Sequence, residues 1–454
     1  MKVFNKHWIR SVAFLLVLAA VVYHLQGLFG YDSRYIFESR KGFRKEARGQ
    51  LDGVYVGGSD VFFFWQPLLA WQDHGIAVRN YCASGMRAAA VKFFVREAAK
   101  SQPDALFIIS LNTFKPEKVQ GLSPHYIHAA VDYMPLSANT LQMTGELVDR
   151  SNFTGLKRLE FYLPIIRYHT RWDSMPSWTF GAPDVDYRSS LYHSTSYLKN
   201  CEDMSRQYDV FDTEEPLSDD MNGIVEDLLD YCDERQLNVL FVKLPQATNQ
   251  KEQGRMRTIQ RMVVERGYPC LDLFDKVSET GMDLREDWVD SNHADIHGSM
   301  KITGVIGDYL VENYKFRDKR NLPQWAGWDA SAAEFNDLVS QYTLPFERDH
   351  ARRILTDIPE LTKATATKQD ITVKWGDAGA VDGYLVYRKS DAEDDLIWRE
   401  VADTDAACRD WSDTDLTPQT SYTYTVVPYV MAEGERVYGS FRARGITAKA
   451  KGEA

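Results

Sequence analysis

The sequence is poor in cysteine, has no surplus of positive charge and contains a single long apolar run. Its five cysteines form no CxxC pair and no metal-type spacing, so we expect scattered buried thiols rather than a disulfide scaffold. The 53 lysines and arginines are outnumbered by 65 aspartates and glutamates, which gives a net charge of -12. An acidic chain repels phosphate backbones, so we expect no nucleic-acid partner. There is no low-complexity tract or internal repeat, and the hydrophobic content of 44% is that of a globular protein.

The one long apolar run covers residues 11–29 and contains no Asp, Glu, Lys or Arg. As a helix it would measure about 28 Å, enough to cross the hydrocarbon core of a bilayer. Three basic residues precede it, as expected for a segment that starts in the cytoplasm: Lys2, Lys6 and Arg10.

No small-x-small cleavage site follows this run, so residues 1–30 are predicted to be an uncleaved signal anchor that holds the protein in the membrane. A cleaved signal peptide is the alternative. Basic residues are also frequent between positions 34 and 48, so charge counting alone does not decide the orientation. Either interpretation exports residues 31–454, with residues 31–50 as a juxtamembrane stalk.

A rhythm of strands and helices follows the stalk. Short apolar runs predict buried strands at 53–57, 105–111, 238–244 and 269–274, and helical periodicity occupies 86–100, 224–236, 253–266 and 300–314. Strands that alternate with helices imply a parallel sheet with helices on both faces, a three-layer α/β domain at residues 51–320. Residues 116–215 are irregular and rich in aromatic side chains, and give no clear pattern.

After about residue 356 the helical periods give way to short alternating strands. A helical connector is expected at 321–356 and an all-β sandwich at 357–448. The run from Leu416 to Tyr422 resembles the tyrosine corner of fibronectin type III domains. Its tyrosine, with Trp375 and Tyr384, is expected in the sandwich core, and the simplest role for such a domain is a spacer or a docking module.

Two segments carry residues suited to catalysis. Ser59 follows two glycines at the end of the first predicted strand, the edge where open α/β folds place their sites. Asp290 and His293 lie three residues apart in one loop, where the carboxylate can orient the imidazole as the base of a hydroxyl nucleophile. The alternatives are an ordinary turn at Ser59 and a polar loop at Asp290.

A metal site is a further alternative for the second segment, because five side chains with ligand chemistry crowd together there. They are Asp287, Asp290, His293, Asp295 and His297. The chain has no HExxH or similar helical ligand spacing, so we expect neither a metal nor another cofactor.

Taken together, these segments resemble the SGNH (GDSL-type) hydrolase superfamily. The resemblance implies that Ser59 is the nucleophile, His293 its base and Asp290 the orienting carboxylate. Two intermediate blocks match as well, and they imply an oxyanion hole formed by the N–H groups of Ser59 and Gly85 and the amide of Asn112. The sequence departs from the family pattern at three flanking positions, which are Gly58, Ser110 and Thr113.

Within that superfamily the chain is most similar to membrane-anchored extracytoplasmic members that modify lipoteichoic acid or alginate. The similarity implies an esterase or an O-acyltransferase that acts on an envelope polysaccharide or teichoic-type polymer. A transferase of this kind would need a polytopic membrane acyltransferase as its donor partner. A non-catalytic envelope scaffold on a degenerate SGNH fold remains the alternative from another class.

Residues 162–178 are dense in arginine, histidine and tryptophan. Such a segment suits a substrate wall, with aromatic faces for sugar rings and guanidinium groups for an anionic polymer. A packed insertion with ion-paired arginines is the alternative. The candidate substrate-binding residues are Arg167, His169, Arg171 and Trp172.

Overall fold

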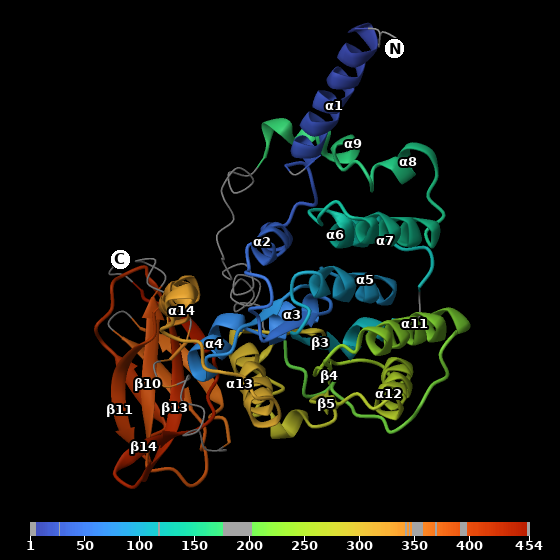
Figure 1. Ribbon diagram of the computed structural model, residues 1–454. Coiled ribbons are helices and arrows are strands. Elements are labelled where there is room, and N and C mark those ends of the chain that lie inside the picture. The colour runs from blue at the N-terminus through green and yellow to red at the C-terminus, as the bar shows by residue number, and fades with distance from the viewer. Residues whose placement is uncertain are drawn as a thin grey trace.

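The computed structural model describes residues 6–26, 28–116, 119–175, 202–340, 343–344, 346, 357–367, 370–390 and 397–451. Three parts follow one another along the chain (Figure 1). An apolar helix, α1 (Lys6–Gln26), projects from one end of an α/β domain, and an all-β domain packs against the side of that domain. This arrangement confirms the parallel sheet with helices, the C-terminal all-β region and the single N-terminal apolar helix.

Five parallel strands form the sheet of the α/β domain, in the order β2-β1-β3-β4-β5. They are β1 (Gly53–Val56), β2 (Val78–Asn80), β3 (Leu106–Ser110), β4 (Val239–Lys243) and β5 (Cys270–Asp272). Every residue of β1, β3 and β4 is buried, as the continuous apolar runs predicted. No pattern of residues predicted the short β2.

The strand order explains where the helices lie. From β1 the chain crosses to β2 at one edge of the sheet, and from β2 it crosses in the opposite direction to β3, β4 and β5. Because such crossovers are right-handed, the helices between β1 and β2 and the helices between β2 and β5 lie on opposite faces of the sheet. One face carries α3 (Ser59–Phe64), α4 (Pro67–His74) and α13 (Ile296–Asn313), and the other carries α5 (Ala88–Ala99), α11 (Asp219–Arg235) and α12 (Gln250–Glu265) (Figure 1). The direction of the crossovers changes between β1 and β3.

Parts of the segments expected to be a stalk and a connector, residues 34–43 and 326–340, pack into the core of this domain. Helix α2 (Arg34–Phe43) is almost entirely buried, and the Arg40 guanidinium lies 4.2 Å from the centre of the Phe94 ring. Helix α14 (Ala326–Ser340) packs on α4, where Trp71 meets Trp328 at 5.1 Å between ring centres. Aromatic side chains on both segments are buried in the domain core. The polar composition of residues 31–50 gave no indication of this burial.

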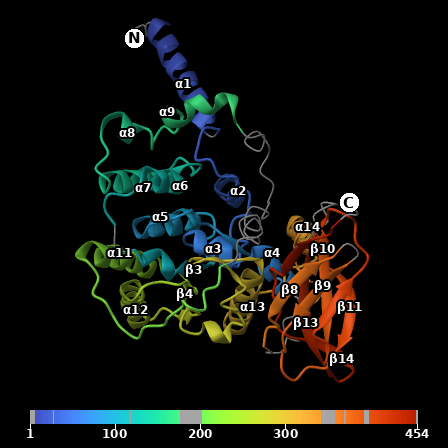
Figure 2. The same ribbon diagram turned by 180° about the vertical axis from the view of Figure 1, so that it is seen from behind.

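Further helices build layers outward from α5 toward α1 (Figures 1 and 2). They are α6 (Pro124–Val131), α7 (Ala138–Asp149), α8 (Gly155–Leu159), α9 (Ile165–Tyr168) and the 3-10 helix η2 (His169–Asp173). The buried His128 ties these layers together, since Nδ1 lies 3.1 Å from both carboxylate oxygens of Asp132 and Nε2 lies 3.4 Å from Glu160 Oε1. A buried imidazole requires such partners.

The C-terminal domain consists of antiparallel sheets with the orders β11-β10-β13-β14, joined by β15, and β12-β9-β8. Its strands are β8 (Leu361–Ala366), β9 (Ile371–Trp375), β10 (Gly383–Ser390), β11 (Arg399–Asp405), β12 (Asp410–Asp413), β13 (Ser421–Ala432), β14 (Glu435–Tyr438) and β15 (Ile446–Lys449). Trp375, Tyr384 and Tyr422 are buried, as expected. The Tyr422 hydroxyl accepts the N–H of Thr417 at 2.8 Å, the contact that defines a tyrosine corner.

A buried carboxyl group lies where the two domains meet. Glu286 of the α/β domain accepts the backbone N–H of Arg444, close to the Arg442 guanidinium. Nearby, His297 faces Phe441 with 6.3 Å between ring centres. Burial raises the pKa of Glu286 to about 7, although both arginines oppose the shift.

We expect Glu286→Gln to weaken the pH dependence of stability. The pKa of Glu286 is higher in the folded protein than the value near 4.3 of an unfolded chain. The protonated carboxyl group therefore contributes fully to the free energy of unfolding below about pH 4.3. That contribution is lost as the pH rises through about 7. The difference in the free energy of unfolding between the variant and the wild type should therefore shift in favour of the variant by on the order of 1–2 kcal/mol from pH 5 to pH 8.

Thermal unfolding followed across this pH range measures the effect. Glu312→Gln, which alters an exposed carboxylate on α13, is the matched control. Parallel pH profiles for wild type and Glu286→Gln would contradict the assignment of a raised pKa to this carboxyl group.

Candidate active site

Ser59 lies at the carboxyl edge of the sheet, in the turn that joins β1 to α3. The turn is too crowded for a side chain at Gly57, where an added Cβ would lie 2.5 Å from Val61 Cγ2 and 2.8 Å from Ser110 Cβ. The tight turn places Ser59 at the first position of α3. This edge, between β1 and β3, is where the crossover direction changes and where open α/β sheets bind their ligands.

Asp290 and His293 face each other across a short hairpin of β6 (Trp288–Asp290) and β7 (His293–Ala294). The turn between them is stabilised by Asn292, whose N–H donates to Asp290 Oδ1 at 2.8 Å. Trp288 is fully buried and packs edge-on against Phe64 of α3, with 6.0 Å between ring centres. The hairpin is therefore anchored to the helix that carries Ser59.

The structure brings Ser59, His293 and Asp290 into one chain of hydrogen bonds. His293 Nε2 lies 2.9 Å from Ser59 Oγ, and Nδ1 lies 2.9 Å from each carboxylate oxygen of Asp290. The Phe63 ring packs on the imidazole at 4.3 Å between centres. Burial raises the pKa of Asp290, but the hydrogen bond and charge of His293 outweigh it and lower the pKa overall. An ionised Asp290 can then orient His293 as a base for the hydroxyl.

The backbone around Gly85 lies beside this serine. Ala83 N–H donates to Gly57 O at 3.2 Å, and Gly85 adopts φ +59, a left-handed conformation that favours glycine. Within the described part of the chain, neither the N–H of Ser59 nor that of Gly85 is bonded to an acceptor. Free N–H groups beside a nucleophile are suited to stabilise an oxyanion.

A tyrosine that the sequence analysis did not consider lies over this turn. A Cβ at Gly85 would be 2.3 Å from Tyr126 Cε1 of α6, and the Arg87 guanidinium lies 4.1 Å from the centre of the same ring. Tyr126 lies in the segment whose irregular composition obscured its structure. It adds an aromatic and a cationic group beside the Ser59 site.

Asn112 is more constrained than its expected oxyanion role requires. It lies in the 3-10 helix η1 (Leu111–Phe114) after β3, and its side chain is buried against the end of β4. Oδ1 accepts the N–H of Leu244 at 2.8 Å, and Nδ2 donates to Leu244 O at 2.9 Å. One amide hydrogen at most is left for an oxyanion, so this role stays a prediction.

A buried carboxylate follows the candidate nucleophile directly. Asp60 accepts a hydrogen bond from Ser110 Oγ, and burial raises its pKa, although Ser110, Lys115 and His293 oppose the shift. The only signal in the sequence was a single charge at the start of an apolar run. Ser110, one of the departures from the family pattern, thus binds Asp60 of the neighbouring turn.

Lys115 is a second residue that the sequence analysis missed. Its Nζ donates to Gln246 Oε1 at 2.8 Å and to Oδ1 of Asn292, the turn residue between Asp290 and His293. Burial lowers the pKa of Lys115, and the carboxylates of Glu252, Asp60 and Asp290 oppose the shift. A lone lysine before a proline gives no pattern from which this contact could be predicted.

The four candidate substrate-binding residues lie on α9 and η2, at the base of α1 (Figure 1). Arg171 donates to Gly30 O at 2.9 Å and pairs with Asp32 at 3.0 Å, and Arg167 pairs with Glu160 at 3.3 Å. His169 and Trp172 are exposed. Both arginines are thus ion-paired within the described residues, and a substrate-binding role for the four side chains stays a prediction.

Two of the residues considered as metal ligands bind a lysine and a helix N-terminus. Asp287 pairs with Lys301 at 2.6 Å, and Asp295 caps α13 by accepting the N–H of Gly298 at 3.0 Å. In the part of the chain that the structure describes, no three His, Cys, Asp or Glu side chains are placed to hold a metal ion.

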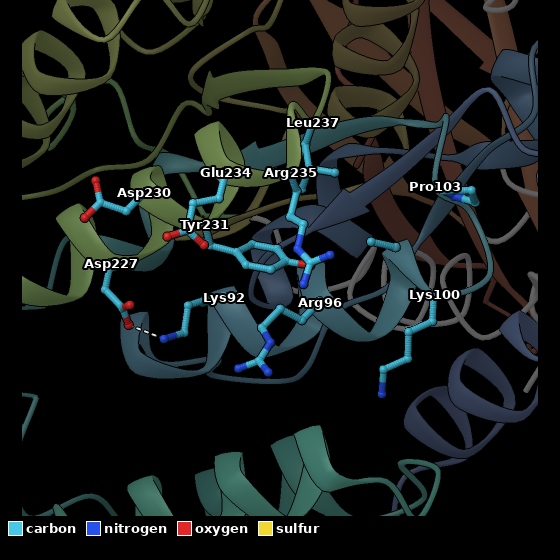
Figure 3. Close-up of a pocket in the computed structure, with 11 residues that line it drawn as sticks. Lys92, Arg96, Lys100, Pro103, Asp227, Asp230, Tyr231, Glu234, Arg235 and Leu237 are labelled. Atoms are coloured by element: carbon cyan, nitrogen blue, oxygen red, sulfur yellow. Dashed lines mark hydrogen bonds and ion pairs between the residues drawn. The ribbon is translucent and has the colours of Figure 1, made fainter.

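A groove of about 720 Å³ lies between α5 and α11 (Figure 3). Tyr231 lies at its centre, flanked by arginines and by acidic side chains, and Lys92 pairs with Asp227 across it. Its lining includes Pro103 and Leu237, which precede β3 and β4. The groove therefore opens at the amino edge of the parallel sheet, opposite the edge that carries Ser59.

Comparison with known proteins gives no identity to this site. No protein-family model and no curated protein matches the sequence. A β-1,2-glucanase from Parabacteroides distasonis is similar at 17% identity over 22% of this chain and 13% of that chain, with a TM-score of 0.18. The FN1-FN3 domains of chicken CNTN1 match at 18% identity over 21% and 31%, with a TM-score of 0.18.

The FN5 domain of Drosophila Lar matches at 21% identity over 22% of this chain and 99% of that chain, with a TM-score of 0.17. The matched stretch spans only a small share of the glucanase and of the chicken chain. Likenesses of this size carry no argument, so the chemistry of Ser59 rests on the geometry around it.

We expect Lys115→Met to slow the reaction of Ser59 with a fluorophosphonate by up to ~10²-fold, the cost of a slightly misplaced catalytic group. Without the ammonium group the Asn292 turn loses a partner, and the Asp290–His293 hairpin is held less firmly. The measurement is the second-order rate constant of labelling in the full chain.

Lys92→Met is the matched control, because the ammonium group of that lysine also has a polar partner but lies in the groove at the far edge of the sheet. An unchanged labelling rate in a Lys115→Met protein of wild-type thermal stability would show that Lys115 does not support the hairpin.

Proposed function

We propose that this protein is a serine-dependent acyl-ester enzyme, an esterase or an O-acyltransferase, that works through an acyl-Ser59 intermediate. The observation that carries the proposal is the hydrogen-bonded chain from Ser59 Oγ through the His293 imidazole to the Asp290 carboxylate. Its location at the carboxyl edge of the sheet, between β1 and β3, agrees with this chemistry.

Each group has a distinct task in the proposed reaction. His293 Nε2 takes the proton of Ser59 Oγ as the oxygen attacks the ester carbonyl, and Asp290 stabilises the imidazolium that forms. The N–H groups of Ser59 and Gly85 donate to the oxyanion of the tetrahedral intermediate. His293 then protonates the departing alcohol and leaves acyl-Ser59. Water or a sugar hydroxyl, deprotonated by His293, takes the acyl group and restores the serine.

The finer fold assignments belong to the same proposal. The strand order β2-β1-β3-β4-β5, with the serine after β1 and the Asp-x-x-His hairpin before α13, supports an SGNH-type domain. The bond from Thr417 N–H to the Tyr422 hydroxyl supports a fibronectin type III-like C-terminal domain. Close packing of that domain beside Glu286 and His297 suits a docking module for the α/β domain.

The proposed substrate is an ester-bearing envelope polysaccharide or teichoic-type polymer outside the membrane. Within the described residues, α1 is the one helix that is long and apolar enough to span a bilayer, and it would hold the enzyme at that surface. A transferase needs an acyl donor from the cytoplasm, and one spanning helix cannot form a path for it. A polytopic membrane acyltransferase would then be the partner, whereas an esterase needs none.

The rival proposal is a non-catalytic scaffold that keeps the fold and binds partners through its C-terminal domain. Labelling by a fluorophosphonate separates the two proposals, because only an activated serine reacts rapidly. Modification located at Ser59 supports an enzyme. A full chain that is folded and unreactive supports the scaffold.

We expect Ser59→Ala and His293→Ala to abolish nearly all hydrolysis of an acetyl ester, because each removes the attacking oxygen or its base. Asn112→Ala should lower kcat about 10²–10³-fold if its amide donates to the oxyanion. Loss of the Leu244 bonds should also lower its Tm, so kcat is compared at a temperature where all variants are folded. Wild-type turnover by Ser59→Ala would place the nucleophile elsewhere.

Incubating the full chain with an acetyl ester, with and without oligosaccharide acceptors, decides between the two reactions. Acetate release alone indicates an esterase, and acetylated sugar indicates a transferase. For a transferase, we expect modification of the native polymer to stop when α1 is deleted, since the donor partner is a membrane protein. Transfer that persists unchanged without membranes would overturn the donor-partner proposal and leave the acyl-Ser59 chemistry intact.

A further inference from the structure

The end of the α/β domain from which α1 emerges exposes large apolar side chains. On α8, Leu156 is 73% exposed and Leu159 is 47% exposed, and their spacing places them on one helix face. On η2, Trp172 is 72% exposed. Both helices lie at the α1 end of the molecule in Figures 1 and 2, and the sheet lies beyond them.

Basic side chains surround these apolar groups. From residue 155 to 173, the end of η2, the chain carries four basic residues, Lys157, Arg158, Arg167 and Arg171, and two acidic residues, Glu160 and Asp173. Lys157, Arg158 and Arg167 pair with Asp149 or Glu160, and each side chain is still more than a third exposed. Exposed leucine and tryptophan beside lysine and arginine are the composition of surfaces that bind the interface of a bilayer.

This surface is attached directly to the end of α1. Arg171 donates to Gly30 O at 2.9 Å and pairs with Asp32 at 3.0 Å, a few residues after α1 ends. Tyr31 bonds to His125 Nε2 of α6 at 2.7 Å. A bilayer that holds α1 therefore lies next to α8 and η2, and the distance between them cannot vary freely.

We propose that Leu156, Leu159 and Trp172 form a lipid-docking surface that enters the headgroup region of an anionic bilayer, with the neighbouring cations on lipid phosphates. The proposal rests on α1 as a membrane anchor and not on the acyl-transfer chemistry. Helix α6 connects this surface to the candidate active site, since its His125 contacts Tyr31 and its Tyr126 covers Gly85. Docking would hold the Ser59 site at a defined height and orientation above the membrane.

The test uses the full chain in nanodiscs that contain phosphatidylglycerol, with brominated lipids as fluorescence quenchers. The readout is the difference in quenched tryptophan emission between the wild type and Trp172→Phe. This difference comes from Trp172 alone and excludes Trp8 in α1, which is present in both proteins. We expect quenching of Trp172 and a severalfold decrease when Leu156 and Leu159 are both changed to serine. Trp398→Phe, in the C-terminal domain, is the matched control and should leave the quenched emission unchanged.

Lipid composition separates electrostatic docking from simple proximity. Replacing phosphatidylglycerol by phosphatidylcholine, or adding Lys157→Glu and Arg158→Glu, should reduce the quenching of Trp172. Quenching of Trp172 that is absent in anionic nanodiscs, in a chain whose Trp8 is quenched, would overturn the proposal. All measurements are made with Ser59→Ala as well, so that their outcome is independent of any turnover.

Discussion

The candidate site depends on holding the Asp290–His293 hairpin against the first turn of α3. Ser59 and His293 are 234 positions apart, and a shift of about 1 Å would break their 2.9 Å hydrogen bond. Three contacts prevent such a shift. Trp288 is buried against Phe64, the Phe63 ring packs on the imidazole, and Lys115 holds the Asn292 turn. The apolar residues of α3 thus position the base for the serine at its start.

Charge in this region is balanced between the buried Asp60 and two partly buried groups, Asp290 and Lys115. Asp290, Asp60 and Lys115 lie close enough to influence one another, and burial opposes the charged form of all three. Mutual attraction and hydrogen bonds offset that cost in part, which is the usual condition for charges away from water. Asp60 is the most dependent on its neighbours, because it is the group that would remain buried if an opposing charge were lost.

The layers of the α/β domain connect this site to the N-terminal helix. Residues 34–43 are part of the core, so the chain enters the folded domain only a few residues after α1 ends. Helices α6 to α9 then fill the space between α5 and α1 (Figure 1). The domain is therefore attached closely to its N-terminal helix. The C-terminal domain contacts the α/β domain at Glu286, just before the hairpin, and at His297, just after it.

The sequence by itself determined the elements whose pattern is local. Buried parallel strands are continuous apolar runs, and amphipathic helices repeat with the helical period, so β1, β3, β4, α5 and α12 lie close to where they were expected. The order of the motifs along the chain also pointed to Ser59, Asp290 and His293. The short β2 and the short helices α6, α8 and α9 carry too few residues for a periodic signal.

Only the tertiary structure decided which polar side chains meet. Lys115 reaches the site, and Ser110 meets Asp60, because β3 lies beside β1 in the sheet, a neighbour relation that no local pattern records. The same folding carries Arg167 and Arg171 away to Glu160 and Asp32, although their composition suited a substrate wall. Hydrogen bonds and ion pairs act over a few ångströms in space, whereas composition and periodicity report only the neighbours along the chain.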